Sequence, residues 1–412
     1  MNIRVARNAL CVLACATVAG CGGSSGGSVT SGSNAVGAVY AMTNAADTNT
    51  VVAYARAADG TLTLIGSAAT EGQGSGPTNV ASGPGGNAID PLASNYALVM
   101  STDNRFVFAV NAGSDEVSSF IVNSDFSLSH VSTVASGGSA PVSIATIDNA
   151  IFVANSNAGV GTITSFTVSE TGALTSAGGE VTLAGRPTAI SLTKDKNTLI
   201  ATLVDTLQLQ VYSVANTALT ETSLFSYPAP PEGRNVANPF GLDTFEHNGA
   251  QFAIVADARV FAVNGTEPDP QTSSVTTFSV SGGQLSIVSD DIRADDDGDD
   301  SVGPITACWA VTNADGTMAF IAKTNDNSIT SYNLNESGEA VLSASTAFAE
   351  DGDFTEDGLT DQFVIGNVVY QLVSAAGSVL SLSINADTGV LTEIDRDTDL
   401  SLVGGNQGIT GF

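Results

Sequence analysis

Short apolar stretches separated by small polar turns run through almost the whole chain, and one such unit returns at intervals of roughly fifty residues. Its clearest copy is FVFAVNA at 106–112, and related stretches lie at 38–44, 151–157, 199–205, 252–258, 319–325 and 368–374. Each copy precedes an alternating stretch with one large residue at a fixed place, namely Tyr54, Phe120, Phe166, Tyr212, Phe278, Tyr332 and Leu382. Alternation bounded by Gly, Asn, Asp and Ser is typical of β-strands, so we expect an all-β chain.

Two further strands complete each unit. Fourth strands follow tight turns, as at 58–66, 170–178 and 387–395, and leading strands lie at 140–146, 186–192, 238–244 and 303–311. Each of these leading strands has a proline near its start, where a missing N–H does least harm to a sheet. Seven units of four antiparallel strands predict a seven-bladed β-propeller over residues 36–412. Because the first unit lacks a leading strand, we expect residues 405–412 to complete the first blade and close the ring.

The repeats resemble those of the lactonase family of propellers, the YVTN-type proteins that include 6-phosphogluconolactonase-like and carboxymuconate cyclase-like members. The resemblance is carried by VYAMTNAADTNTVVAYARAADGTLT, FVFAVNAGSDEVSSF and ITACWAVTNADGTMAFIAKTNDNSITSY. It implies hydrolysis of a small, sugar-type lactone or a related cycloisomerase reaction. Since these motifs specify blades and not chemistry, no catalytic residue is carried over from the family, and whether the chain is an enzyme stays open.

The N-terminal residues 1–20 have the features of a bacterial lipoprotein signal peptide. Arg4 and Arg7 precede an apolar run too short to span a bilayer, and small residues stand directly before Cys21. We therefore expect cleavage at this point, lipid attachment to Cys21 and a Gly/Ser-rich tether over residues 21–35. This predicts export and anchoring in the cell envelope, at the outer membrane facing the periplasm or the exterior. The alternative is an ordinary secretory signal with an incidental cysteine.

Loop length differs between the two faces of the predicted ring. In a propeller, the loops from strand four to the next leading strand and from strand two to strand three share one face. All the long insertions fall in these two classes of loop, at 67–94, 227–238, 258–273, 289–303 and 347–361. Because long loops on a rigid scaffold often carry function, this insertion face is the predicted functional face.

Polar residues expected at the mouth of the insertion face are candidate ligand-binding residues: Asn44, Asn111, Asn155, Arg186, Asn238, Asp257 and Asn325. Asn and Asp are also common turn residues, so a purely structural role is the competing interpretation. Lactone hydrolysis needs a base and hydrogen-bond donors for the oxyanion. The two histidines, His130 and His247, are expected at turns of the opposite face, where we expect them to be structural.

The charge balance is strongly negative, with 42 acidic and 12 basic residues and a net charge of −30. This argues against a nucleic-acid partner and leaves the lipid anchor as the expected membrane contact. Two acidic insertions offer oxygen ligands for calcium, through Asp295, Asp297 and Asp299 and through Asp351, Asp353 and Asp357. Solvated acidic loops are the alternative, and Asp395 is expected at the surface. A non-enzymatic binding or scaffold propeller with cation-dependent loops, which takes a small molecule or an envelope protein as partner, is therefore the competing function.

Overall fold

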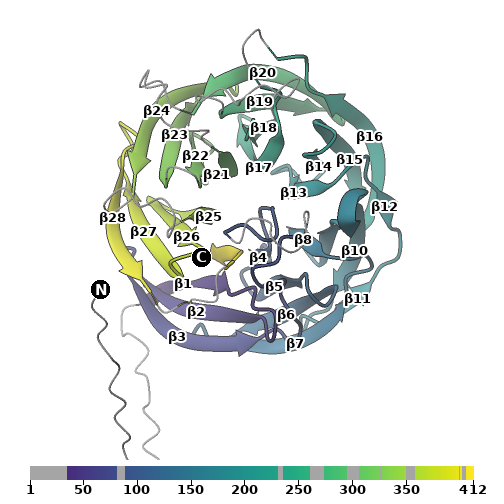
Figure 1. Cartoon of the computed structure of the whole chain (residues 1–412), viewed down its shortest axis with the longest axis vertical. Helices are drawn as coiled ribbons and strands as arrows, with labels where there is room; N and C mark the ends of the chain where they lie inside the picture. The colour runs from purple at the N-terminus through teal and green to yellow at the C-terminus, as the bar shows by residue number, and fades with distance from the viewer. Residues whose placement is uncertain are drawn as a thin grey trace, which may run out of the picture. The chain divides into compact units, whose positions relative to one another are not determined.

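The computed structural model describes residues 35–80, 89–230, 235–259, 273–294, 306–324, 327–348, 358–398, 400 and 405–412. Seven antiparallel sheets are arranged around a central axis, as Figure 1 shows. Besides the strands, the part of the chain that the structure describes contains one 3-10 helix, Asn157–Gly159. No helix within the described ranges is both long and apolar enough to cross a membrane. The predicted all-β, seven-bladed propeller is confirmed.

In the second to seventh blades the first strand in the chain lies innermost, and the later strands follow outward in chain order. The first blade contains β1 (Ala35–Met42), β2 (Thr50–Ala57) and β3 (Leu62–Ala69). The second contains β4 (Leu98–Met100), β5 (Phe106–Asn111), β6 (Glu116–Val122) and β7 (Leu128–Ala135). The third contains β8 (Pro141–Ile147), β9 (Ala150–Asn155), β10 (Thr162–Val168), β11 (Leu174–Ser176) and β12 (Val181–Thr182).

Blades four to seven repeat the same order without interruption. Blade four contains β13 (Pro187–Leu192), β14 (Thr198–Leu203), β15 (Gln208–Ala215) and β16 (Ala218–Ser226), and blade five contains β17 (Pro239–His247), β18 (Ala250–Asp257), β19 (Ser274–Ser281) and β20 (Gln284–Arg293). Blade six contains β21 (Ala307–Thr312), β22 (Met318–Lys323), β23 (Ser328–Leu334) and β24 (Ala340–Ala347). Blade seven contains β25 (Leu359–Ile365), β26 (Val368–Val373), β27 (Ser378–Ile384) and β28 (Leu391–Asp397).

The C-terminal strand β29 (Ile409–Gly411) completes the first blade by pairing antiparallel with β1. Thr410 stands opposite Tyr40, and the backbones of Ala38 and Phe412 exchange hydrogen bonds of 3.1 and 3.0 Å. The Phe412 ring also packs edge-on against Phe126 of the second blade, with the ring centroids 5.7 Å apart. The predicted closure of the ring by the C-terminal strand is therefore confirmed.

The recurring large residue of each third strand is fully buried and lies at a break in the sheet register. In six blades the pairing of strands three and four shifts directly before this residue, at Tyr54, Phe120, Tyr212, Phe278, Tyr332 and Leu382. In the third blade the fourth strand is instead divided into β11 and β12 around Phe166. A bulge bends and twists a strand locally, so the sequence repeat encodes both the core residue and the twist of each blade.

Prolines begin three of the innermost strands, as the sequence predicted. Pro141, Pro187 and Pro239 are the first residues of β8, β13 and β17, and each stands at a register shift with the next strand. The strand order also places β3–β4, β16–β17, β18–β19, β20–β21 and β24–β25 connections on one face, here called the insertion face. The face with the remaining connections, such as the turn between β13 and β14, is called the short-turn face.

One long insertion enters the centre of the ring. Residues 89–97, here called the plug, leave the insertion between β3 and β4 and run beside the innermost strands (Figure 1). Ser94 Oγ donates to the Val142 carbonyl of β8 at 2.8 Å, and the Ser94 carbonyl accepts the Trp309 Nε1 proton of β21 at 3.0 Å. Asn95 N donates to the Thr188 carbonyl of β13 at 2.9 Å. The plug thereby joins blades that are not neighbours in the chain.

Removing the closing strand should destabilise the whole ring. Deleting residues 407–412 exposes the free edge of β1 and removes every pair between β1 and β29, so the free energy of unfolding should fall by about 4 kcal/mol or more. Phe412→Ala, which keeps the strand pairing, should cause a clearly smaller loss. Thermal and chemical unfolding of the two variants and the parent chain provide the measurement, and equal stability of the deletion and the parent would disprove the closure argument.

Candidate functional site

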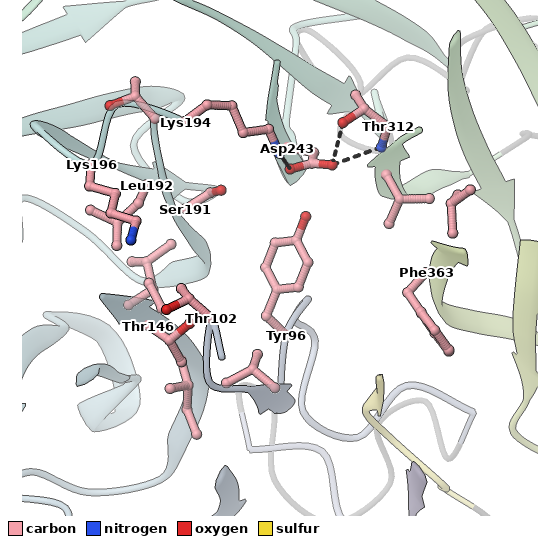
Figure 2. A pocket seen from close by; sticks show the side chains of 17 residues that line it. Tyr96, Thr102, Thr146, Ser191, Leu192, Lys194, Lys196, Asp243, Thr312 and Phe363 are labelled. Atoms are coloured by element: carbon pink, nitrogen blue, oxygen red, sulfur yellow. Dashed lines mark hydrogen bonds and ion pairs between the residues drawn. The ribbon is translucent and has the colours of Figure 1, made fainter. Parts of the chain in front are cut away.

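A cavity of about 390 Å³ opens on the axis at the short-turn face. The C-terminal ends of the innermost strands line it, together with the turn between β13 and β14, and the plug contributes Tyr96 (Figure 2). Its hydroxyl-bearing walls include Thr102, Thr146, Ser191 and Thr312. The described insertion-face candidates do not line this cavity, because they stand at the opposite ends of the blades.

Asp243 of β17 is the one carboxylate among the residues that line the cavity. Its Oδ2 accepts hydrogen bonds from Thr312 N at 2.7 Å and from Thr312 Oγ1 at 2.8 Å, which connects β17 to β21. Its Oδ1 accepts the Thr244 N–H at 2.7 Å and stands 3.8 Å from Lys194 Nζ. The bonds from Thr244 and Thr312 thus hold the Asp243 carboxylate in place. The distance between Asp243 Oδ1 and Lys194 Nζ is longer than a direct hydrogen bond, so a water or a ligand oxygen can bridge the two atoms.

Tyr96 points from the plug towards Asp243, as Figure 2 shows, and its hydroxyl donates to the Ala310 carbonyl at 3.4 Å. Burial, followed by the negative charges of Asp243 and Asp361, raises the pKa of Tyr96 well above its ordinary value. The phenol is therefore a neutral hydrogen-bond donor at physiological pH. Its backbone φ of 65° is unusual for a bulky residue and is held by the surrounding contacts of the plug.

Two lysines bring positive charge to the mouth of the cavity. Lys194 and Lys196 lie on the turn between β13 and β14, and their side chains are 44% and 38% exposed. Lys196 Nζ also forms an ion pair with Asp148 at 2.5 Å. Because Lys196 is paired with Asp148, Lys194 stands beside Asp243 and Asp195 lies between the two lysines, the turn offers two ammonium donors for a polar ligand and no net positive charge.

The three described asparagine candidates at the ends of second strands form structural hydrogen bonds. Asn44 Nδ2 donates to Gly405 O at 3.2 Å, which holds the start of the closing segment. Asn111 Nδ2 donates to Ser118 Oγ at 2.7 Å, and Asn155 Nδ2 lies 3.4 Å from Thr164 Oγ1. All three side chains are buried, so the structural interpretation accounts for their positions.

The other described candidates do not converge on one ligand site. Arg186 Nη2 forms an ion pair with Asp205 at 3.3 Å. The Asp257 carboxylate is buried and accepts the Thr276 hydroxyl proton at 2.6 Å, and the Asn238 carbonyl accepts the Ala258 N–H at 3.0 Å. The remaining calls lie outside the described residues: Cys21, Asn325, Asp295, Asp297, Asp299, Asp351, Asp353 and Asp357.

The two histidines stand beside turns of the short-turn face but away from the cavity. His130 Nε2 lies 2.8 Å from Thr133 Oγ1, and His247 packs against Phe245 and Phe252. Their expected structural role agrees with these contacts. Among the described residues, no three His, Cys, Asp or Glu side chains gather as a group able to hold a metal ion.

Sequence reasoning did not select the residues that form the cavity. The signal for Lys194 and Lys196 was present, because the turn TKDKN carries two of the few basic residues of the chain. Asp243 and Thr312 lie within alternating strands, where nothing in the local pattern separates them from other polar positions. Tyr96 reaches the cavity only because the plug enters the ring, which no repeat predicts.

A family described as lactonase, seven-bladed β-propeller, matches residues 87–191 of this sequence. The matched part begins beside the plug and ends in β13, so the resemblance seen in the repeats is supported over two complete blades and their flanks. No curated protein sequence matches the chain.

Solved structures share the fold at low sequence identity. A protein of Bacteroides uniformis proposed to be a 6-phosphogluconolactonase is 16% identical, with 91% of this chain and 99% of that chain covered at a TM-score of 0.65. The periplasmic gluconolactonase of Pseudomonas aeruginosa is 16% identical, with 91% and 98% covered at a TM-score of 0.61. A protein from Lactobacillus plantarum is also 16% identical, with 91% and 99% covered at a TM-score of 0.66. At these identities the likeness shows the fold alone.

The buried Asp257 should make stability depend on pH. Burial, partly offset by the Arg259 charge, raises the pKa of this carboxyl from 3.8 to about 6 in the folded state. The folded state therefore binds more protons than the unfolded state between these values, and the Asp257 contribution to stability is lost as pH rises from about 4 to about 6. Asp257→Asn should flatten this part of the dependence, by roughly 1.4 kcal/mol for each pKa unit.

Denaturant unfolding of Asp257→Asn and of the parent chain at several pH values tests this expectation. Asp205→Asn, which changes a more exposed carboxylate, is the control and should keep the parental slope. Identical slopes for Asp257→Asn and the parent would show that the Asp257 carboxyl titrates normally.

Proposed function

We propose that this lactonase-like propeller hydrolyses a small, sugar-type lactone in the cavity at its short-turn face. The observation that carries the proposal is the convergence of Asp243, Tyr96, Thr312 and Lys194 on one cavity. A carboxylate, a neutral phenol and an ammonium group are the types of group that ester hydrolysis requires. The likeness to a gluconolactonase and to the lactonase family supports the same class of reaction.

In the proposed reaction, a water bound between Asp243 and Lys194 attacks the lactone carbonyl carbon. Asp243 Oδ1 accepts a proton from that water, while the Thr312 bonds to Oδ2 hold the carboxylate in place. The Lys194 ammonium or the Tyr96 hydroxyl stabilises the negative charge that forms on the carbonyl oxygen. The ester C–O bond then breaks as the protonated Asp243 carboxyl gives its proton to the ring oxygen, which leaves as a hydroxyl and restores the carboxylate. The product is a hydroxy acid.

The remaining polar groups of the cavity suit a hydroxylated substrate. Ser191 presents a hydroxyl that can donate to and accept from sugar hydroxyl groups, and the Thr146 hydroxyl, which donates to the Met100 carbonyl at 3.1 Å, can accept from them. Lys196 lies at the mouth, where its ammonium group, paired with Asp148, can also donate a hydrogen bond to a polar substituent of the substrate. Aliphatic side chains such as Ile144 and Ile190 complete the walls and exclude bulk water around the reacting ester.

The proposal also includes export and lipid anchoring. The signal-like residues 1–20, the small residues before Cys21 and the Gly/Ser-rich stretch that follows support it. A propeller of the same fold is a periplasmic protein in Pseudomonas aeruginosa, which is consistent with an envelope location for this chain.

Loss of either central charge should abolish most of the hydrolysis. Asp243→Asn keeps the shape of the side chain but removes the base, so kcat/KM for an active lactone should fall about a hundredfold or more. Lys194→Ala should cause a comparable loss if the ammonium group stabilises the oxyanion. The measurement is proton release from a panel of sugar-type and aliphatic lactones, each with its spontaneous rate subtracted.

Arg186→Ala is the matched control, because it removes a cation at the insertion face and leaves the cavity intact. Unchanged turnover in this variant and lost turnover in Asp243→Asn would locate the reaction at the short-turn face. The reverse pattern would transfer the site to the insertion face. No turnover by the parent chain on any lactone would favour the non-enzymatic binding or scaffold function.

Replacement of Cys21 should release the protein from the membrane. Cys21→Ser removes the thiol that would carry the lipid, so the chain should move from the membrane fraction to the soluble fraction of a bacterial host. Fractionation with an antibody against the propeller, together with incorporation of labelled fatty acid, measures both effects. Equal distribution of the two forms, without labelling of the parent, would support the ordinary secretory signal instead.

A further inference from the structure

Two buried carboxylates hold the plug from its insertion-face side, away from the proposed lactone site. Asp90 belongs to the plug itself, and its Oδ1 accepts the Ala93 N–H at 2.9 Å. Asp361 belongs to β25, and its Oδ2 accepts the Tyr96 N–H at 3.2 Å. Asp90 is 7% exposed and Asp361 is 1% exposed. They therefore accept N–H groups of the plug backbone three residues apart, at Ala93 and Tyr96, and the Asp90 charge acts on Asp361.

Neither carboxylate has a cationic side chain as a direct partner within the described ranges. Arg186 is the positive group that acts on Asp90, but its guanidinium is paired with Asp205. Burial raises the pKa of Asp90 to about 7, and burial together with the Asp90 charge raises the pKa of Asp361 to about 8. A buried carboxylate must be protonated, paired or bound to a cation. Protonation leaves a neutral pair, whereas a bound cation satisfies both groups at once.

Further side-chain oxygen atoms that could ligate a metal ion lack hydrogen-bond partners in the described part of the chain. Both amide atoms of the Asn95 side chain are buried without a hydrogen bond. Asp361 Oδ1 has no partner in good hydrogen-bond geometry, although the backbone N–H groups of Gln362 and Ala97 act on this carboxylate. Asn95 directly precedes Tyr96, whose N–H reaches Asp361. Gln407 donates its Nε2 proton to the Ile89 carbonyl at 3.2 Å, next to Asp90, and its Oε1 is buried without a partner. Unpartnered buried acceptors are rare and costly, and these belong to Asn95, which adjoins Tyr96 in the chain, and to Gln407, which is bonded to the backbone next to Asp90.

We propose that Asp90, Asn95, Asp361 and Gln407 form a binding site for one calcium ion on the insertion side of the plug. Two carboxylates balance the charge of a divalent cation, and the amide oxygens of Asn95 and Gln407 are hard neutral ligands of the type that calcium takes. Backbone carbonyls and water complete the coordination, which calcium accepts in flexible geometry. The ion would connect the plug, the seventh blade and the closing segment. The site is separate from the acidic insertions and does not depend on the proposed lactone reaction.

The position of the chain's single tryptophan gives this site its own readout. Trp309 Nε1 donates to the Ser94 carbonyl at 3.0 Å, and Ser94 is bonded to Asn95. A terbium ion in the calcium site therefore lies close enough to the indole to be excited through it. The full chain, freed of metal by EDTA, should show terbium emission on tryptophan excitation, and added calcium chloride should quench it by displacement.

Asp361→Asn is the decisive variant, because it keeps the size of the side chain and removes one charge. We expect it to weaken terbium and calcium binding by about tenfold or more, while Asn95→Ala, which leaves both charges in place, should weaken it less. If Asp361→Asn does not fold, loss of affinity in Asn95→Ala and Gln407→Ala supplies the same evidence. Calcium should also raise the Tm of the parent chain, and this rise should shrink in each variant.

Two controls separate this site from its alternatives. The first control is a variant in which the acidic insertions are neutralised by Asn. It should keep the tryptophan-excited emission, because its buried site is intact. The replaced residues are Asp295, Asp297, Asp299, Asp351, Asp353 and Asp357. Loss of the emission in that variant, with full emission in Asp361→Asn, would overturn the proposal in favour of the acidic insertions. Absence of calcium binding at about pH 9, where pKa values of about 7 for Asp90 and about 8 for Asp361 leave both carboxyls ionised, would overturn the proposal.

Discussion

The hydrogen-bonded pairing of β29 with β1 is the constraint on which the other features depend. Without it the first blade lacks its innermost strand, and the ring has a free edge beside the channel. The outer edge is also joined at this point, because Asp395 Oδ2 of β28 accepts the Leu62 N–H of β3 at 2.9 Å. Asp395 is partly exposed in β28, and its carboxylate also connects the last blade to the first.

The blades could be predicted almost completely from the sequence, because their determinants are local and repeated. Alternation, a proline at the start of a leading strand and one large residue in each third strand determine which side chains face the neighbouring blades. The residues after Gly405 could be recognised as a missing strand because the repeat itself showed which strand was absent. The short leading strand β4 has no proline, and the pattern did not reveal it.

The candidate site could not be predicted in the same way, because its geometry depends on contacts distant in the sequence. Loop length directed attention to the insertion face, where Asn44 and Asn111 proved to serve the hydrogen-bonding needs of buried strand ends. Asp243 becomes distinctive only once Thr312 and Lys194 from two other blades stand beside it. The scarcity of basic residues was the usable signal, and it pointed to the turn at 193–197 as strongly as to Arg186.

The plug links the two sides of the channel through one residue. The backbone of Tyr96 is bonded to Asp361 on the insertion side, and its side chain lies in the cavity towards Asp243 on the short-turn side. Its positive φ costs on the order of 1–3 kcal/mol and persists because contacts on both sides hold it. Any change that loosens Asp361 from the plug therefore lets Tyr96 relax, and the cavity loses a wall that no strand of the repeat could replace. The stability of the ring and the shape of the cavity are in this way connected through a segment that belongs to no blade.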